Sequence, residues 1–195
     1  NMTVSAPMNE SELRNMMYSA SQKHSGPYSI RYPRGTGSIV DWKQPFEAIP
    51  LGQGRRIKTG KDLAILSIGA IGTQATEAIL ELEKRGIDAA HYDMRFVKPL
   101  DEIMLHEVFG QFDHVITLED GCVMGGFGSA VLEFMGDNNY RASVKRLGLP
   151  DAYVEHGTQA ELYAENKYDS AAILATAEEM LAAAGAGSAR SIQRA

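Results

Sequence analysis

The chain has 195 residues, of which 44% are hydrophobic and 23% are charged, an ordinary composition for a globular protein of one or two domains. No stretch is apolar for long enough to cross a bilayer, and the N-terminus lacks the basic flank and apolar core of a signal peptide. We therefore expect a cytoplasmic protein with no membrane partner. The formal net charge is −6 and the basic residues are scattered, which excludes a nucleic-acid footprint. The single cysteine, Cys122, excludes an internal disulfide and a multi-cysteine zinc site.

The first part of the chain predicts a short strand, a helix and a second strand. Residues 3–7 are extended up to a proline, and Asn9 and Glu12 then have the spacing of a helix N-terminal capping pair. The helix would bury an apolar stripe made of Leu13, Met16, Met17 and Ala20. Residues 28–32 predict the second strand.

An arginine follows the second strand on a turn. Pro33 lacks an amide proton and keeps Tyr32 extended, so the strand must end here and Arg34 lies just beyond it. A guanidinium at a strand end suits bidentate recognition of a carboxylate or phosphate, and it equally suits an ion pair between domains. The residue pattern alone does not separate these two roles. Arg31, inside the predicted strand, is assigned a structural role.

Residues 37–60 have the composition of a linker. They contain prolines and glycines and show no helical period, although some strand content is expected between Gly52 and Ile57. We expect the basic residues of this segment to lie on a face exposed to solvent; they are Arg55, Arg56 and Lys58.

A regular alternation of strands and helices begins at residue 62. The predicted strands cover residues 62–68, 87–93, 115–117 and 142–147, with a short edge piece at Tyr153 and Val154. The predicted helices lie between Gly72 and Gly86, after Asp101, after the glycines at 125–128, at 158–165, and from Asp169 or Ser170 to Ala184. The helix after Asp101 would bury Ile103, Leu105, Val108 and Phe109. This order predicts an α/β fold with a mainly parallel sheet and helices on both faces, followed by a disordered tail at 185–195.

The strand at 115–117 leads into two acids, Glu119 and Asp120, and a glycine-rich loop that ends at Gly128. Loops at the carboxyl ends of parallel strands line the crevice where ligands meet the sheet. This loop has neither G-x-G-x-x-G nor Gly-Lys-Ser/Thr, and its carboxylates would repel a polyphosphate, so we predict close helix packing rather than phosphate binding. Adjacent side chains at a strand end diverge, so only one acid can point into a given site, and we expect structural or interface roles for both.

Other nucleophiles and metal ligands form no recognisable pattern. Cys122 lies beside the two acids and is assigned a structural role. Ser129 does not fit the G-x-S-x-G pattern of a nucleophile. The histidines lie on separate elements without metal-ligand spacing, and they are His24, His91, His106, His114 and His156. His156 precedes a predicted helix and is assigned no role.

Four motifs occur together in a fixed order. They are RYPRG at 31–35, DMRFVKPLD at 93–101, ITLEDG with MGGFGSAV at 116–131, and LGLPD with EHGTQAEL at 147–162. In this order and spacing they closely resemble the 1-deoxy-D-xylulose-5-phosphate synthase family, which are transketolase-like thiamine diphosphate enzymes. The resemblance covers residues 1–182, whereas transketolase itself and the β subunits of 2-oxo acid dehydrogenases fit these motifs less well.

The resemblance implies a division of the chain and a reaction. Residues 1–40 would be the last part of a pyrimidine-binding α/β domain, 41–60 a linker, and 61–184 a transketolase C-terminal-like domain. The complete enzyme would condense pyruvate, with decarboxylation, and D-glyceraldehyde 3-phosphate to 1-deoxy-D-xylulose 5-phosphate, the first step of the non-mevalonate isoprenoid pathway. Thiamine diphosphate and Mg²⁺ would bind upstream of this chain. The chain would then hold no catalytic, cofactor-binding or metal residue and would be inactive alone.

The resemblance assigns a role to one residue, Arg34 of RYPRG, which would bind the phosphate of the aldehyde substrate. The implied partners are the missing N-terminal portion of the same protein, a second copy in a homodimer, and the small-molecule substrates. Two alternatives remain open: a non-catalytic interaction or scaffold domain of transketolase-like fold, and a segment of a transketolase or of a 2-oxo acid dehydrogenase β subunit.

Overall fold

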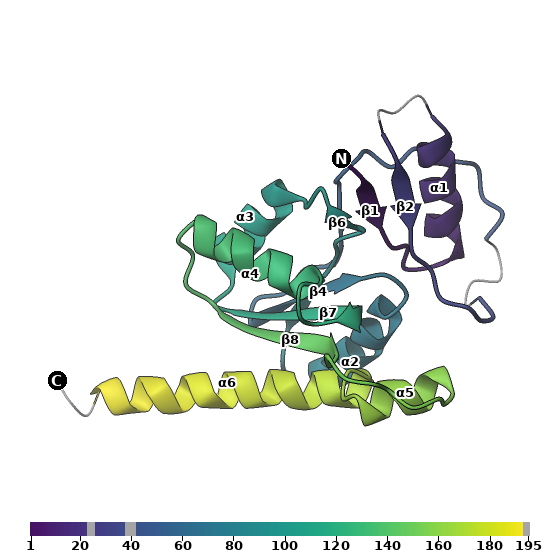
Figure 1. Cartoon of the computed structure of the whole chain (residues 1–195). Coiled ribbons are helices and arrows are strands. Elements are labelled where there is room, and N and C mark those ends of the chain that lie inside the picture. The colour runs from purple at the N-terminus through teal and green to yellow at the C-terminus, as the bar shows by residue number, and fades with distance from the viewer. Residues whose placement is uncertain (23–25, 38–41, 193–195) are drawn as a thin grey trace.

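The computed structural model describes residues 1–22, 26–37 and 42–192, and its strands form two sheets (Figure 1). The first segment contains β1 (Thr3–Ser5), α1 (Glu10–Ser21) and β2 (Tyr28–Ile30). The later strands are β3 (Arg55–Lys58), β4 (Leu63–Ile68), β5 (Ala89–Asp93), β6 (Phe96–Lys98), β7 (His114–Cys122) and β8 (Ser143–Leu149). The later helices are α2 (Gly72–Lys84), α3 (Glu102–Gln111), α4 (Phe127–Asp137), α5 (Gln159–Glu165) and α6 (Ser170–Ile192). Within the described residues, no helix is long and apolar enough to span a membrane.

The larger sheet has the strand order β3-β5-β4-β7-β8. Its last four strands are parallel, and β3 pairs antiparallel with β5 at one edge. Side chains of β4 alternate between two cores: Leu63 and Ile65 pack with residues of α2 and α6, whereas Ala64 and Leu66 pack with residues of α3 and α4. Figure 1 shows α3 and α4 over one face of the sheet and α2 and α6 over the other. The predicted α/β fold with a mainly parallel, doubly covered sheet is confirmed.

The smaller sheet joins the first segment to the rest of the chain. Its order is β2-β1-β6, with β1 parallel to β2 and antiparallel to β6. We expected residues 95–101 to be a loop, but Phe96 lies opposite Ser5 and Lys98 opposite Val4 in the ladder. A three-residue strand that forms by pairing with a distant segment leaves no periodic pattern in its own sequence.

Helix α1 begins as predicted but buries a different face. The Asn9 side chain caps the helix, because its Oδ1 accepts a hydrogen bond from the backbone N–H of Glu12 at 3.0 Å. Met16 of the predicted apolar stripe is fully buried, whereas Met17 is 57% exposed. The buried face instead includes the carboxylate of Glu12, and a buried carboxylate requires a partner.

That partner is a pair of arginines from the C-terminal part of the chain. The Glu12 carboxylate accepts hydrogen bonds from Nε and Nη2 of Arg95 at 2.6 and 2.9 Å, and from Nη1 of Arg55 at 2.9 Å. Nε of Arg55 also donates to Asp93 at 3.0 Å. The Glu12 and Asp93 side chains are 6% and 0% exposed, so solvent screens these contacts only weakly. Burial raises the pKa of Asp93 to about 6, although the neighbouring Arg55 acts to lower it.

Strand β3 lies in the segment for which we expected a linker with a solvated basic face. The strand content agrees with the expectation, but the basic side chains are paired. Nη1 of Arg56 lies 2.8 Å from Oε1 of Glu107, and Nζ of Lys58 lies 2.9 Å from Oδ1 of Asp88. These partners come from α3 and from the segment before β5, so β3 is tied into the larger sheet. Arg56 remains exposed, in agreement with the expectation, whereas Arg55 and Lys58 are partly buried.

Three expectations about the surface differ from the structure. Ile103 is 84% exposed, because it is offset by about 200° around the helix from Leu105, which is buried. Tyr153 is exposed and belongs to no strand. Helix α6 does not end at Ala184 but continues to Ile192, because alanine and arginine favour helix and an interior glycine costs only about 1 kcal/mol. It therefore includes most of the stretch for which we expected disorder, and residues 193–195 lie outside the described residues.

We expect Glu12→Gln to lower the free energy of unfolding by about 3 kcal/mol, because in a largely buried site Arg95 would lose its charged partner and Arg55 would lose one of its two. Chemical denaturation followed by circular dichroism measures this loss. Glu107→Gln is the matched control, since the Arg56–Glu107 pair is about half exposed on both sides, and should cost less than about 1 kcal/mol. Equal losses in the two variants would show that the Glu12 network does not hold α1 in place.

Candidate functional site

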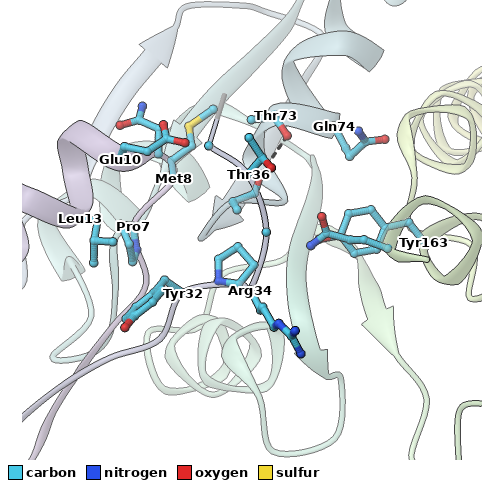
Figure 2. A pocket seen from close by; sticks show the side chains of 16 residues that line it. Pro7, Met8, Glu10, Leu13, Tyr32, Arg34, Thr36, Thr73, Gln74 and Tyr163 are labelled. Atoms are coloured by element: carbon cyan, nitrogen blue, oxygen red, sulfur yellow. Dashed lines mark hydrogen bonds between the residues drawn. The ribbon is translucent and has the colours of Figure 1, made fainter. Parts of the chain in front are cut away.

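A cavity of about 380 Å³ lies between the first segment and the C-terminal part of the chain. One wall comes from the turn before α1 and from the loop at 32–37, and the other comes from α2 and α5 through Thr73, Gln74 and Tyr163 (Figure 2). Within the described residues, Arg34 supplies the basic group of this lining and Glu10 the acidic one. The cavity therefore combines an apolar floor with a few polar groups, as ligand sites do.

Arg34 lies where the sequence placed it, beyond the end of β2 and directly after Pro33. Its side chain is exposed, and no carboxylate among residues 1–22, 26–37 and 42–192 forms an ion pair with it. In the view of Figure 2 its guanidinium is directed away from Glu10. A guanidinium in this setting has donors to offer to an anion in a bidentate arrangement.

Arg31 is placed differently from the expectation. Strand β2 ends at Ile30, so Arg31 lies outside the strand, and its Nη2 is 3.3 Å from Oδ2 of Asp120. This ion pair crosses from the first segment to the end of β7. The structure thus separates the two arginines of the RYPRG motif: Arg31 is matched by a carboxylate, and Arg34 lines the cavity.

The acids at the end of β7 diverge, as predicted for neighbouring strand residues. Glu119 turns into the protein, where its two carboxylate oxygens accept the backbone N–H groups of Phe127 and Gly128, each at 2.8 Å. These are the first amides of α4, so the carboxylate occupies the position that an anionic ligand takes at a helix N-terminus. Burial raises the pKa of Glu119, and the two amide hydrogen bonds oppose that rise.

The glycine loop serves this arrangement. A Cβ atom at Gly126 would overlap the carboxylate of Glu119 and the carbonyl oxygen of Cys122. The glycine therefore lets the loop close over Glu119, in agreement with the packing role that we predicted for it. Asp120 turns the other way and accepts a hydrogen bond from the hydroxyl of Tyr168 at 3.2 Å, besides its ion pair with Arg31.

The other candidate side chains form no reactive group. Cys122 is a half-buried thiol. The Ser129 hydroxyl donates to the Val123 carbonyl at 2.9 Å and accepts from the Gly125 amide at 3.0 Å, so it stabilises the loop. His156 is exposed on the segment before α5, and His24 lies outside the described residues.

His91, which the sequence analysis assigned to no metal site, is buried in β5. Nε2 of His91 lies 2.8 Å from the hydroxyl of Ser67, and both residues are buried. Burial lowers the pKa of His91 to about 4, with a further contribution from Arg55, so the ring is neutral near pH 7. Among the described residues nothing hydrogen-bonds its Nδ1, so the pair lacks the orienting acid of a catalytic triad.

Two features of the described residues bear on metal and diphosphate binding. In the part of the chain that the structure describes, no three His, Cys, Asp or Glu side chains are grouped closely enough to hold a metal ion. The N-terminus of α4 is filled by Glu119, which excludes a diphosphate there. Within the described residues, the basic group that lines the cavity is the guanidinium of Arg34.

Comparison with known proteins gives the family. The profile of the family described as "Transketolase, C-terminal domain" matches residues 52–173. The chain is 59% identical over 181 residues to the 1-deoxy-D-xylulose-5-phosphate synthase of Cytophaga hutchinsonii, and 57% identical over 164 residues to that of Bacteroides thetaiotaomicron. These matches cover 92% and 84% of this chain, and they confirm the resemblance inferred from the four motifs.

The chain spans about a quarter of the length of these relatives, 28% and 25% respectively. Among solved structures, a chain described as a split gene transketolase in an inactive β4 tetramer superposes with a TM-score of 0.80 at 30% identity. The superposition covers 93% of this chain and 58% of that one, and it supports the transketolase C-terminal fold.

We expect Gly126→Ala to lower the free energy of unfolding by about 2 kcal/mol, because the new methyl group would displace Glu119 or the loop. Gly136→Ala within α4, the helix that Gly126 caps, is the control: nothing lies within 4 Å of its Cβ position, so it should be neutral or stabilise by up to about 1 kcal/mol. Thermal and urea denaturation measure both variants. If Gly126→Ala were as stable as Gly136→Ala, the inference that Glu119 packs against the first amides of α4 beneath Gly126 would be refuted.

Proposed function

This chain belongs to the transketolase C-terminal domain family, and from that premise we propose that it is the carboxy-terminal part of a 1-deoxy-D-xylulose-5-phosphate synthase. Identity of 59% and 57% to relatives of that name supports the assignment. The complete enzyme would join the two-carbon unit of pyruvate, after loss of carbon dioxide, to D-glyceraldehyde 3-phosphate, and would open the non-mevalonate isoprenoid pathway.

In this proposal the carbanion chemistry comes from thiamine diphosphate with Mg²⁺. Two observations support placing its contacts elsewhere: Glu119 occupies the N-terminus of α4, and the described residues contain no group of three His, Cys, Asp or Glu side chains that could hold a metal ion. We therefore assign the cofactor contacts to parts of the enzyme outside this sequence, and we propose that the chain alone is inactive. The resemblance to the family further suggests a homodimer in the cytoplasm.

The role proposed for this chain in the reaction is recognition of the substrate phosphate by Arg34. The observation that carries it is the placement of this guanidinium on the cavity wall, without a carboxylate partner in the described part of the chain. A dianionic phosphate would gain charge-assisted hydrogen bonds there, and the rigid planar fork of arginine would fix its orientation.

A second candidate is a non-catalytic assembly role. The structurally similar split gene transketolase chain is described as an inactive β4 tetramer, so a chain of this fold assembles without activity in that protein. A reading frame that continues upstream into cofactor-binding domains would favour the synthase, whereas an independent gene product of this length would favour the assembly role.

In the complete synthase, Arg34→Ala should raise the KM for D-glyceraldehyde 3-phosphate about 10- to 100-fold, because a charge-assisted contact worth about 1.5–3 kcal/mol is lost. Steady-state kinetics with each substrate varied in turn would show this, and the KM for pyruvate should not change. Arg56→Ala, which removes a surface arginine paired with Glu107, is the control and should leave both KM values unchanged. An unaltered KM for the phosphorylated aldehyde in Arg34→Ala would remove Arg34 from the site.

Calorimetric titration of thiamine diphosphate with Mg²⁺ into this chain alone should give no saturable heat, because Glu119 occupies the N-terminus of α4 and we assign the cofactor contacts to other parts of the enzyme. The complete synthase, titrated in the same way, is the positive control. Saturable binding to the isolated chain would contradict the assignment of the cofactor contacts to other parts of the enzyme.

A further inference from the structure

Asp120 connects the two parts of the chain at the edge of the cavity. Its Oδ2 accepts from Nη2 of Arg31 at 3.3 Å, and its Oδ1 accepts from the hydroxyl of Tyr168 at 3.2 Å. Arg31 belongs to the first segment, whereas Asp120 and Tyr168 belong to the C-terminal part. Each carboxylate oxygen thus has one donor, and the two donors come from opposite sides of the junction.

On the C-terminal side of this contact, Asp120 is held by a buried tyrosine, Tyr168. Strand β7 shifts register against β8 between Leu118 and Cys122, and Asp120 lies within this irregular stretch. Tyr168 is 1% exposed and packs against the ring of Tyr163, with centroids 4.9 Å apart. Asp120 is therefore held by a buried hydroxyl rather than by a mobile surface group.

Tyr168 is itself positioned by the end of α5. The backbone N–H of Tyr168 donates to the carbonyl of Tyr163 at 3.1 Å, and that of Lys167 donates to Ala164 at 3.2 Å. Lys167 has a φ of 58°, so α5 ends in a Schellman motif. The apolar contact that usually accompanies this motif is the one between the rings of Tyr163 and Tyr168. Tyr163 also lines the cavity, and the same motif therefore shapes the cavity wall and holds Asp120.

On the other side, Arg31 is fixed close to Arg34. The backbone N–H of Arg31 donates to the carbonyl of Ser5 at 2.8 Å, so its main chain is tied to β1. Only Tyr32 and Pro33 separate it from Arg34, and proline restricts the backbone of both itself and the residue before it. Few backbone torsions between the two arginines are free to change, so we expect a displacement of the Arg31 main chain to displace Arg34 as well.

We infer that Asp120 is a positioning residue for substrate binding: by holding Arg31, it sets where Arg34 stands on the cavity wall. This inference rests on the proposed role of Arg34 in binding the substrate phosphate. Pairing with Asp120 also compensates the charge of Arg31, so that Arg34 is the arginine of this motif without an ion-pair partner among the described residues. The C-terminal part of the chain thereby takes part in substrate recognition without touching the substrate.

The ion pair is suited to positioning rather than to holding the fold together. The side chains of Arg31 and Asp120 are 57% and 19% exposed, and a pair so close to solvent adds little to stability. Variants of either residue should therefore fold, and their effect should appear in binding of the phosphorylated substrate.

The test uses Asp120→Asn and Arg31→Gln in the complete synthase, each alone and combined with Arg34→Ala. Each single variant should raise the KM for D-glyceraldehyde 3-phosphate about two- to fivefold. The kinetic constants for D-glyceraldehyde, which lacks the phosphate, and the KM for pyruvate should not change, and neither should the thermal unfolding midpoint. In the Arg34→Ala background neither substitution should have a further effect, because both act through Arg34. Glu107→Gln, which breaks a comparable exposed pair with Arg56, is the control.

Two results would overturn the inference while leaving the proposed function intact. One is an unchanged KM in both single variants when Arg34→Ala raises it. The other is an effect of Asp120→Asn that persists in the Arg34→Ala background or extends to D-glyceraldehyde, which would show that Asp120 acts elsewhere. An unchanged KM in Arg34→Ala would instead refute the phosphate-binding role itself. If Asp120→Asn lowered the unfolding midpoint, Arg31→Gln at the more exposed end of the pair would decide the question alone.

Discussion

The contact on which the arrangement of this molecule depends is the two-point hydrogen bond between Glu12 and Arg95. Arg95 has a φ of 58°, a left-handed conformation that costs a residue with a side chain roughly 1–2 kcal/mol. The cost is offset because this conformation directs both Nε and Nη2 toward Glu12 and presents the Arg95 carbonyl to the amide of Ala6 at 2.9 Å. Side chain and main chain of one residue thus bind the first segment, and they fix the two walls of the cavity relative to each other.

A second constraint decides where an anion can bind. Helix N-termini attract anions, and α4 begins at a glycine-rich loop at the carboxyl end of a central strand. In this chain Glu119 satisfies the first amides of α4, so that site is closed by the protein's own carboxylate. In the proposed function, the anion is therefore bound by a side chain, that of Arg34. In a chain of net charge −6 a cation must then be kept clear of the many carboxylates, as Arg34 is in the described residues.

The sequence predicted what depends on local patterns and missed what depends on distant partners. The strand at 62–68, the helix between Gly72 and Gly86 and the cap at Asn9 follow from periodicity and from the chemistry of helix ends, and they agree with the structure. Strand β6 and the buried position of Glu12 depend on residues far away along the chain, which no short window contains. For the same reason the sequence left Arg34 between two roles.

The separation of Arg31 from Arg34 shows how a distant residue resolves such an ambiguity. Both are arginines of one five-residue motif, and the sequence assigned Arg31 a structural role without indicating which acid it would pair with. Asp120 is that acid, because the register shift near the end of β7 and the hydroxyl of Tyr168 place its carboxylate within reach of Arg31. The surroundings of a residue in the first segment thus depend on the C-terminal part of the chain. If Arg34 binds the substrate phosphate as we propose, a carboxylate that does not touch the substrate contributes to its recognition through Arg31.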